Sequence, residues 1–426
     1  MDTIKITIKE LGAIKDSIVE LAPVMVFSGE SGLGKSYLAM LCHYFYDMLL
    51  DDSRIDRFFK EKGWVYSEMQ EGFKGSGIAV TIDKKELEDW IAKDAIQYLT
   101  YMLNNSNFTG DISVELPSSV ENQITISFEE EISGLMNNED VYVKLSALKL
   151  IYRAKDETIG SESPFAILLR FGLINSMLGD FKAIKETYVF PPSRGPVLTE
   201  EVAPRTGLYE KFKNDLVKIN RIPPHPEEAD KDLIALLRNV LEGSVRRTSD
   251  NYQYTFNGKE IPISAAAASI REIAPLAMLV ERTDIKNAVM MIEEPEAHLH
   301  PLKQRMMADI MSVMNNGGAY MQITTHSDYF LRRLNELISL KRLHENCQNE
   351  EEFDKICENV GIDKRLEFDY SRLAAYLLVR REDGSSFVEK QSLEDGIPFA
   401  SFSKAIDDSL QSRYKLNKYA ELYECD

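Results

Sequence analysis

Eight residues, Gly29 to Ser36, have the spacing of a phosphate-binding loop. They read Gly-Glu-Ser-Gly-Leu-Gly-Lys-Ser, which fits the pattern G-x-x-x-x-G-K-[S/T]. Glycines let backbone N–H groups point inward toward an anion, at a helix N-terminus that also favours negative charge. In this pattern Lys35 reaches the β- and γ-phosphates of a nucleotide, and the Ser36 hydroxyl ligates Mg²⁺. The residues predicted to contact the nucleotide are Gly29, Glu30, Ser31, Gly32, Leu33, Gly34, Lys35, Ser36 and the following Tyr37.

The segments on either side of this loop are the strand and the helix that phosphate binding by such a loop requires. An apolar run, Val24 to Phe27, precedes the loop, and a helix-like stretch, Tyr37 to Leu50, follows it. The alternative is a chance match in a glycine-bearing loop, which at average glycine content arises about one or two times in a hundred chains of this length. The strand–loop–helix context favours nucleotide binding.

A second apolar run ends in carboxylates. Residues Ala288 to Ile292 are wholly apolar and are followed by Glu293-Glu294-Pro295-Glu296. A buried parallel strand with acids at its C-terminal end is typical of a Walker B strand. We expect Glu293 to hold Mg²⁺ through water and Glu294 to activate the attacking water. The alternative is a strand that meets an acidic helix start, since carboxylates favour helix N-termini.

A histidine follows the next predicted strand. Residues Ala319 to Thr324 are strand-like and end in Thr325-His326-Ser327-Asp328. A lone histidine is more often a surface residue or one whose hydrogen bonds are already satisfied. Open α/β sheets, however, place ligand-binding groups at this position. We predict that His326 hydrogen-bonds the γ-phosphate or the attacking water. Lys35, Glu294 and His326 are therefore the candidate catalytic residues.

Composition indicates an ordinary globular protein. The 426 residues are 44% hydrophobic and 28% charged, and no apolar stretch is long enough to span a bilayer. Four scattered cysteines without metal-like spacing favour a reduced, cytoplasmic chain with no membrane partner. The formal charge of −19 weighs against bulk non-specific DNA binding, although a local basic groove or a basic partner stays possible.

Hydrophobic periodicity places the remaining elements. Alternation over Thr3–Leu11 and the run Ile14–Leu21 predict a small antiparallel β layer ahead of the loop. No long charged heptad run is present, so no extended coiled-coil arm is predicted. Helices are expected over 84–103, 141–153, 164–178, 201–220, 227–241 and 350–359 and from about 400, strands over 187–190, 374–379 and 386–389, and a hairpin over 111–116 and 123–128.

Two motifs together resemble a known family. The run Glu293 to Pro301, with Gln304 and Thr324 to Ser327, resembles the ABC/SMC-type AAA family ATPases of bacterial anti-phage defence and DNA maintenance. The similar group includes OLD-family nucleases and the ATPase subunits of the Septu and PARIS systems. The resemblance is good over residues 1–50 and 285–335. In the middle of the chain, only the order of the predicted helices and strands is similar.

The resemblance implies a role for each matching residue. Glu293 and Glu294 would be the Walker B pair, Ala297 to His300 the D-loop position, and His326 the switch histidine. Pro191 to Arg194 resembles the Pro-x-x-Arg element near the Q-loop position, which makes Arg194 a candidate nucleotide-binding residue.

The segment in the signature position departs from the family pattern. Residues Ser264 to Glu272 have no Gly-rich signature, although Ser264 and Ser269 are candidates for phosphate contact or for helix N-caps. An Ala-rich helix start is also good plain helix sequence, so both interpretations stay open. The missing glycines weigh against tight head-to-head closure and fast hydrolysis.

The implied fold is an α/β P-loop NTPase, an ABC-type head with a small N-terminal antiparallel β layer and an inserted helical and β lobe. We divide the chain into a first half of the head (1–60), the inserted lobe (61–260), a second half (261–345) and a C-terminal α/β extension (346–426). OLD-type nucleases append an acidic metal-binding domain after the switch histidine, and no such cluster is found here. Lone acids such as Asp383 and Asp395 are predicted to lie in surface loops.

The leading functional hypothesis is an ATPase that works with Mg²⁺ in a dimer or higher homo-oligomer. It would control a separately encoded effector, a nuclease or toxin, in anti-phage defence. One alternative is a DNA-repair or DNA-maintenance ATPase that acts directly on nucleic acid. Another is a nucleotide-bound switch or scaffold with negligible hydrolysis. A small-molecule kinase is disfavoured, because Glu294 and His326 fit an activated water better than a substrate hydroxyl.

Overall fold

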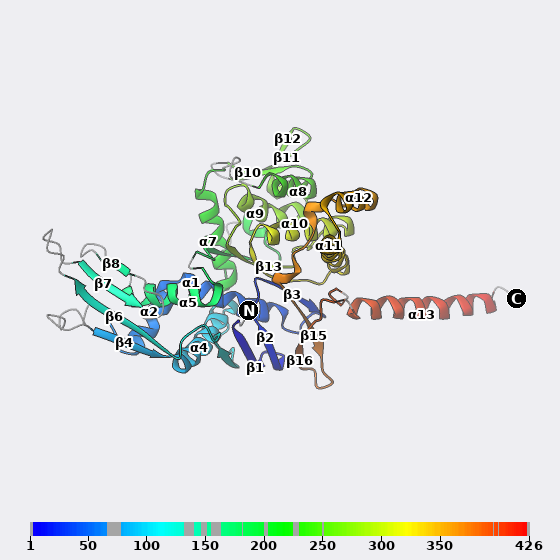
Figure 1. Cartoon of the computed structure of the whole chain (residues 1–426). Helices are drawn as coiled ribbons and strands as arrows, with labels where there is room; N and C mark the ends of the chain where they lie inside the picture. Colours follow the sequence, from blue (N-terminus) through cyan, green and yellow to red (C-terminus); the bar gives the residue numbers. More distant parts are fainter. Residues whose placement is uncertain are drawn as a thin grey trace.

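One nine-stranded sheet forms the centre of the molecule (Figure 1). The computed structural model describes residues 3–65, 78–131, 140–145, 151–154, 163–180, 182–199, 203–224, 230–248, 251–394, 396–398 and 400–423. In spatial order the strands are β5 (Gly110–Glu115), β1 (Lys5–Leu11), β2 (Ile14–Glu20), β16 (Ser386–Lys390), β15 (Leu373–Arg380), β3 (Val24–Gly29), β14 (Tyr320–Thr324), β13 (Ala288–Glu293) and β9 (Glu186–Phe190).

Five neighbouring strands of this sheet, β15, β3, β14, β13 and β9, run parallel. Every residue of β3, β13 and β14 is buried, as continuous apolar runs in a parallel sheet require. In their register Phe27 lies beside Thr324, and Thr324 lies beside Glu293. The three predicted functional segments therefore leave the sheet at the same edge.

The rest of the sheet is largely antiparallel. β1 pairs with β2 as the sequence predicted, but β5 and β16 extend this layer so that it is continuous with the parallel strands. The C-terminal part of the chain supplies β15 and β16, and β15 lies directly beside β3. Residues after 345 therefore help to build the sheet that carries the loop.

Helices surround the sheet. α1 (Lys35–Leu50) packs against β3, β13, β14 and β9, and nearly all of its residues are buried. The other helices are α2 (Asp52–Glu61), α4 (Lys84–Leu103), α5 (Pro164–Leu178), α6 (Gly195–Thr199), α7 (Gly207–Arg221), α8 (Lys231–Leu241), α9 (Ala268–Val280), α10 (Pro301–Asn316), α11 (Asp328–Asn346), α12 (Glu350–Val360) and α13 (Ala400–Tyr423). None of the helices in the described ranges combines the length and apolar content that a membrane span needs.

Two smaller antiparallel sheets complete the described structure. One consists of β4 (Ile78–Asp83), β6 (Gln123–Glu131), β7 (Asp140–Leu145) and β8 (Ile151–Ala154), and the other of β10 (Ser244–Arg247), β11 (Tyr252–Phe256) and β12 (Lys259–Pro262). The four-stranded sheet extends away from the central sheet together with α2, α4 and α5 (Figure 1).

Two sequence-based predictions fail in this region. The predicted helix over 141–153 is wrong where it is described, because β7 and β8 lie there; Val141 and Val143 alternate with polar residues and favour a strand. The predicted hairpin is also wrong, since β5 pairs with β1 and β6 pairs with β4. Alternation indicates a strand but does not identify its partner.

The close approach of β15 to the loop makes Gly29 sensitive to substitution. Its φ is +128°, and a Cβ there would lie 2.5 Å from the Leu378 carbonyl oxygen. Gly32, with φ +78°, has open space around it and is the matched control. We expect Gly29→Ala to destabilise the chain by about 1–3 kcal/mol more than Gly32→Ala does. Thermal melting checks this, and equal melting temperatures for the two variants would contradict it.

Candidate functional site

The loop after β3 is shaped for an anion. Gly29, Gly32 and Gly34 have positive φ angles of 128°, 78° and 100°, which L side chains rarely adopt. Gly34 is also the N-cap of α1 and leaves the first N–H groups of the helix without a side-chain cap. These groups are the donors that bind phosphate at a helix N-terminus.

Lys35 lies inside this loop. Its Nζ donates to the carbonyl oxygens of Gly29 (2.9 Å) and Glu30 (2.7 Å), and the side chain is buried. Burial lowers the pKa of Lys35 to about 8, an effect opposed by the carboxylates of Glu294, Glu296 and Glu293. Two carbonyl oxygens of the loop therefore hold the ammonium group of Lys35 within the loop itself.

Ser36 and Glu293 form the candidate magnesium site. The Ser36 hydroxyl donates to a carboxylate oxygen of Glu293 across the space between α1 and the end of β13. Burial raises the pKa of Glu293 to about 7. A hydroxyl and one carboxylate fit Mg²⁺, which takes one or two carboxylates and completes its shell with phosphate and water.

Glu294 and His326 face each other at the edge of the sheet. Their side chains are 40% and 33% exposed, with 3.7 Å between the Glu294 Oε1 and the His326 Nε2. The Glu294 backbone has φ 46°, and its N–H donates to the Thr324 carbonyl at 3.0 Å. Burial and the nearby Lys35 charge lower the pKa of His326, which favours a neutral imidazole. A carboxylate and a neutral imidazole at this spacing can together orient a water molecule.

Glu296 is a functional candidate that the sequence reasoning missed. Its Oε1 accepts from the Thr325 hydroxyl (2.7 Å) and from the backbone N–H of His326 (2.8 Å). The side chain is 5% exposed, and within the described structure its Oε2 has no hydrogen-bond partner. Glu296 therefore fixes the backbone that carries His326. The signal was the third acid of Glu-Glu-Pro-Glu, which was not given a role because two acids complete a Walker B pair.

Arg194 joins the ends of three elements. Its guanidinium donates to the carbonyl oxygens of Glu272 (2.7 Å) and Glu293 (3.0 Å), and also reaches that of Glu294 (3.4 Å). The Glu272 carboxylate accepts from the backbone N–H groups of Arg194 and Gly195. The structure thus brings Arg194 to the turn after β13 as a buried residue that binds protein carbonyl groups. Its predicted nucleotide contact stays a prediction.

The segment in the signature position lies at the start of α9. Ser264 is exposed in a 3₁₀ turn over Ile263–Ala265, and Ser269 is half-buried in the first turn of α9. The N-cap of α9 is Ala267, and no side chain caps the helix. The N-cap interpretation is therefore wrong for both serines, and their contact with phosphate stays a prediction.

Residues Ala297 to His300, which are predicted to occupy the D-loop position, lie in the turn between β13 and α10. His298 has a φ of 62°, and the His300 side chain accepts from the Leu302 N–H at the start of α10. Gln304 accepts from the Ser327 hydroxyl at 2.5 Å and donates to the Leu299 carbonyl. The turn after β13 is thus tied to the loop that carries His326.

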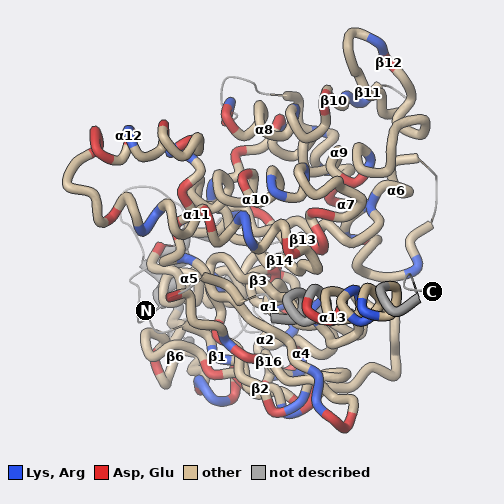
Figure 2. Tube along the Cα trace, turned by 90° about the vertical axis from the view of Figure 1, so that its right-hand side faces the viewer, with Lys and Arg blue, Asp and Glu red and all other residues tan. Residues whose placement is uncertain are grey.

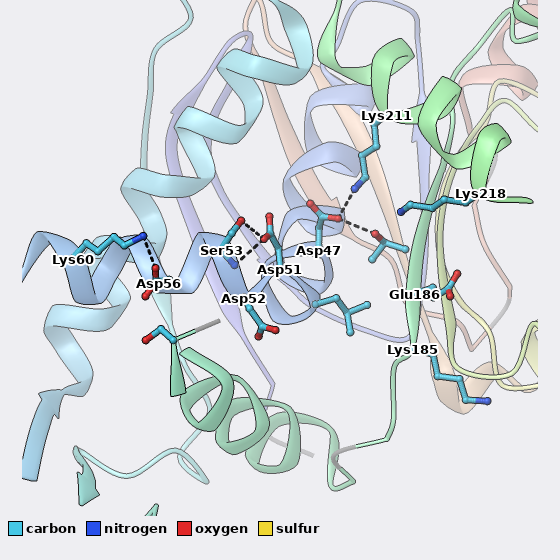
Figure 3. Close-up of a pocket in the computed structure, with 13 residues that line it drawn as sticks. Asp47, Asp51, Asp52, Ser53, Asp56, Lys60, Lys185, Glu186, Lys211 and Lys218 are labelled. Carbon is cyan, nitrogen blue, oxygen red and sulfur yellow. Dashed lines mark hydrogen bonds and ion pairs between the residues drawn. The ribbon is translucent and has the colours of Figure 1, made fainter. Parts of the chain in front are cut away.

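A cavity of about 730 Å³ lies at the other end of α1 (Figure 3). Its lining comes from the last turns of α1, from α2, from the start of β9 and from α7. Asp47 accepts there from Thr187 (2.8 Å) and Lys211 (2.6 Å), which joins α1 to β9 and α7. Asp47 follows Lys35 by twelve residues, or about 18 Å along the helix. This cavity is therefore separate from the phosphate-binding loop.

Comparison with known proteins adds one family and a set of structures. Residues 199–331 match the AAA ATPase domain family, a range that contains Glu293, Glu294 and His326. The fold is that of a P-loop NTPase head. No curated protein matches the chain.

Three similar solved structures are heads of SMC proteins. One is an SMC head bound to the C-terminal winged-helix domain of ScpA, with 12% identity over 92% of this chain and 98% of that chain (TM-score 0.38). Another is the SMC head domain from Thermotoga maritima, with 11% identity over 92% and 100% (TM-score 0.35). The third is an Smc head with an extended coiled coil bound to the C-terminal domain of ScpA, derived from Pyrococcus furiosus, with 11% identity over 97% and 100% (TM-score 0.38).

The hydrogen bonds of Glu296 lead to a test of its positioning role. We expect Glu296→Ala to lower the kcat for ATP hydrolysis about tenfold to a hundredfold, because the loop that carries His326 loses two hydrogen bonds and the imidazole is displaced. ATP affinity should change little. Glu296→Gln keeps one oxygen acceptor for Thr325 and His326 and should retain most of the activity. Steady-state kinetics and nucleotide titration check this. Equal losses of activity in the two variants would show that the carboxylate charge matters and the hydrogen bonds do not.

Proposed function

We propose that this chain is an ABC/SMC-type ATPase that hydrolyses ATP with Mg²⁺ in a homo-oligomer and controls a separately encoded effector in bacterial anti-phage defence. One observation carries the ATPase part of the proposal. Lys35 and Ser36 come after β3, Glu293 ends β13, and Glu294 and His326 follow β13 and β14. All five residues lie at the same edge of the sheet. This is the set of groups that phosphoryl transfer to water needs.

Each residue has a distinct proposed role. The loop N–H groups and Lys35 hold the β- and γ-phosphates, and Ser36 with Glu293 holds Mg²⁺. Bound Mg²⁺ supplies charge neutralisation at the phosphate oxygens. Glu294 orients the attacking water and accepts its proton, and His326 hydrogen-bonds the water or the γ-phosphate. The contribution of the chain is mainly positioning and charge stabilisation.

The exposure of Glu294 and His326 supports the oligomer. Both side chains are partly exposed, although hydrolysis of a phosphoanhydride is favoured where bulk water is excluded. A second subunit is proposed to cover this face, with Ser264 and Ser269 as its candidate contacts to the nucleotide. Because α9 begins without glycines, we expect this closure to be weaker than in heads with a Gly-rich signature.

The effector and the defence context rest on the resemblance of Glu293–Pro301 and Thr324–Ser327 to the ATPases of such systems. The effector would be a nuclease or a toxin. The nucleotide state of the head would regulate it.

Substitution of Glu294 tests hydrolysis directly. We expect Glu294→Gln to bind ATP normally and to lower turnover at least about a hundredfold, because the water loses its base. Glu121→Gln changes an exposed acid between β5 and β6 and is the matched control. Phosphate release and nucleotide binding are measured for both. Wild-type turnover in Glu294→Gln would remove Glu294 from the mechanism, and a wild-type chain without turnover, alone or with its partners, would support the switch hypothesis.

A DNA-binding assay separates the proposal from the DNA-maintenance alternative. With a formal charge of −19, the isolated chain should not retard duplex DNA at about 0.1–0.2 M salt. A gel-shift series over salt concentration, with and without ATP, checks this. A shift that weakens steeply with salt would favour direct action on nucleic acid.

A further inference from the structure

The hairpin of β15 and β16 lies against the phosphate-binding loop. β15 is a parallel neighbour of β3, with Leu378 beside Gly29, so its C-terminal end reaches the same edge of the sheet as the loop. β15 ends at Arg380, which pairs with Ser386 at the start of β16. Both residues therefore lie beside the loop, although the sequence separates them from it by about 350 residues.

Two side chains of the hairpin donate hydrogen bonds to carbonyl groups of the loop. The Nη2 of Arg380 donates to the Ser31 carbonyl oxygen at 3.3 Å. The Ser386 hydroxyl, which is fully buried, donates to the Leu33 carbonyl oxygen at 2.7 Å. These two carbonyl groups of the loop therefore point toward the hairpin.

The planar peptide bond then fixes the direction of the next N–H groups. In a trans peptide the C=O and the following N–H point in opposite directions. The N–H groups of Gly32 and Gly34 therefore point away from the hairpin. Within the described part of the chain, neither N–H group has a hydrogen-bond acceptor. Backbone N–H groups surround the phosphates in a loop of this pattern, so the hairpin orients two donors that are available to an anion.

Arg380 also neutralises the acid of the loop. Glu30 is the only acidic residue between Gly29 and Ser36, and its carboxylate Oε2 lies 3.3 Å from the Nε of Arg380. A carboxylate beside a bound polyphosphate repels it, and the guanidinium reduces this repulsion. The two side chains are 49% and 59% exposed, and ion pairs at such exposure add little to stability. The pair therefore matters more for a bound anion than for the fold.

The neighbouring arginine of the hairpin has different partners. The guanidinium of Arg381 binds the Asp16 carboxylate at 3.1 Å, which ties the hairpin to β2. Lys390 and Glu20 form a second ion pair between β16 and β2. Basic and acidic residues lie close together around β2 and β16 in Figure 2. Attachment of the hairpin to β2 is thus separate from the contact of Arg380 with the loop.

We propose that the β15–β16 hairpin is part of the nucleotide site, with Arg380 and Ser386 as positioning residues for the phosphate-binding loop. They hold the loop so that the Gly32 and Gly34 N–H groups face the phosphates, and Arg380 offsets the charge of Glu30. This inference rests on the proposed binding of ATP. It adds that the loop needs side chains from the C-terminal part of the chain to bind phosphate tightly.

The experiment compares adjacent residues of the same type. Binding of AMP-PNP, a non-hydrolysable ATP analogue, to the full chain with Mg²⁺ is measured by isothermal titration calorimetry. We expect Arg380→Ala to weaken binding about tenfold, because the loop loses a charged donor and the carboxylate of Glu30 loses its partner. Arg381→Ala is the matched control and should bind within about twofold of the wild type.

The two serines of the hairpin form a second matched pair. Ser386→Ala removes the hydrogen bond to Leu33 and should weaken AMP-PNP binding about threefold to tenfold. Ser385→Ala removes a hydroxyl that bonds Asp383 within the turn of the hairpin and should leave binding unchanged. An equal loss in the two variants would contradict the role of Ser386.

Two further readouts distinguish positioning from a merely structural role of Arg380. Glu30→Gln in the Arg380→Ala background removes the unpaired carboxylate and should recover affinity at least about threefold. In steady-state kinetics the loss in Arg380→Ala should appear in the KM for ATP, with kcat within about threefold of the wild type. Thermal melting within a few degrees of the wild type confirms that this half-exposed substitution leaves the fold intact.

The failure of this inference differs from the failure of the proposed function. A full chain that binds neither AMP-PNP nor ATP would overturn the proposed function and this inference with it. Wild-type affinity in Arg380→Ala, an equal loss in Arg381→Ala, or no recovery on addition of Glu30→Gln would overturn the role of the hairpin alone.

Discussion

The site depends on one constraint, the in-register packing of three buried parallel strands. β3, β14 and β13 have no exposed residue, so their order and register are fixed by burial on both faces. Because Phe27, Thr324 and Glu293 lie side by side, the loops that follow these strands begin at the same edge of the sheet. Arg194 then holds the carbonyl ends of β13 and β9 to α9, which makes the turn after Glu293 a rigid support.

Charge at this edge is balanced in two layers. The inner layer pairs the buried Arg194 with Glu272, and this pair is satisfied within the protein. The outer layer places Lys35 among Glu293, Glu294 and Glu296, with burial acting against the charge on Lys35 and on Glu293. A polyanion together with a divalent cation would suit this outer layer, because the anion meets the lysine and the cation meets the carboxylates. Arg194 belongs to the inner layer, which positions the site. Its sequence motif is local, but its role depends on contacts with Glu272 and Glu293, which are far away in the sequence.

The sequence predicted the parts of the fold that local pattern determines. Strand, loop and helix around Gly29–Ser36 were recognisable because continuous apolar runs border a motif with a physical role, and the same holds for Glu293 and His326. The strands at 374–379 and 386–389 were also predicted, but not their place beside β3, since pairing across about 350 residues leaves no local signal. The predicted helix over 141–153 and the predicted hairpin failed for the same reason. The role of Glu296 was missed because it depends on a contact with a loop thirty residues away.

The proposed contact between copies follows from the charges of the outer layer. Closure of a second subunit over Glu294 and His326 is proposed to need nucleotide, because without a polyanion and a divalent cation the contact would cover Lys35 and three carboxylates that have no such partners. The start of α9 has no glycines and no side-chain cap, so we expect its contribution to this contact to be weak. ATP would then both assemble the proposed pair of heads and be consumed by it.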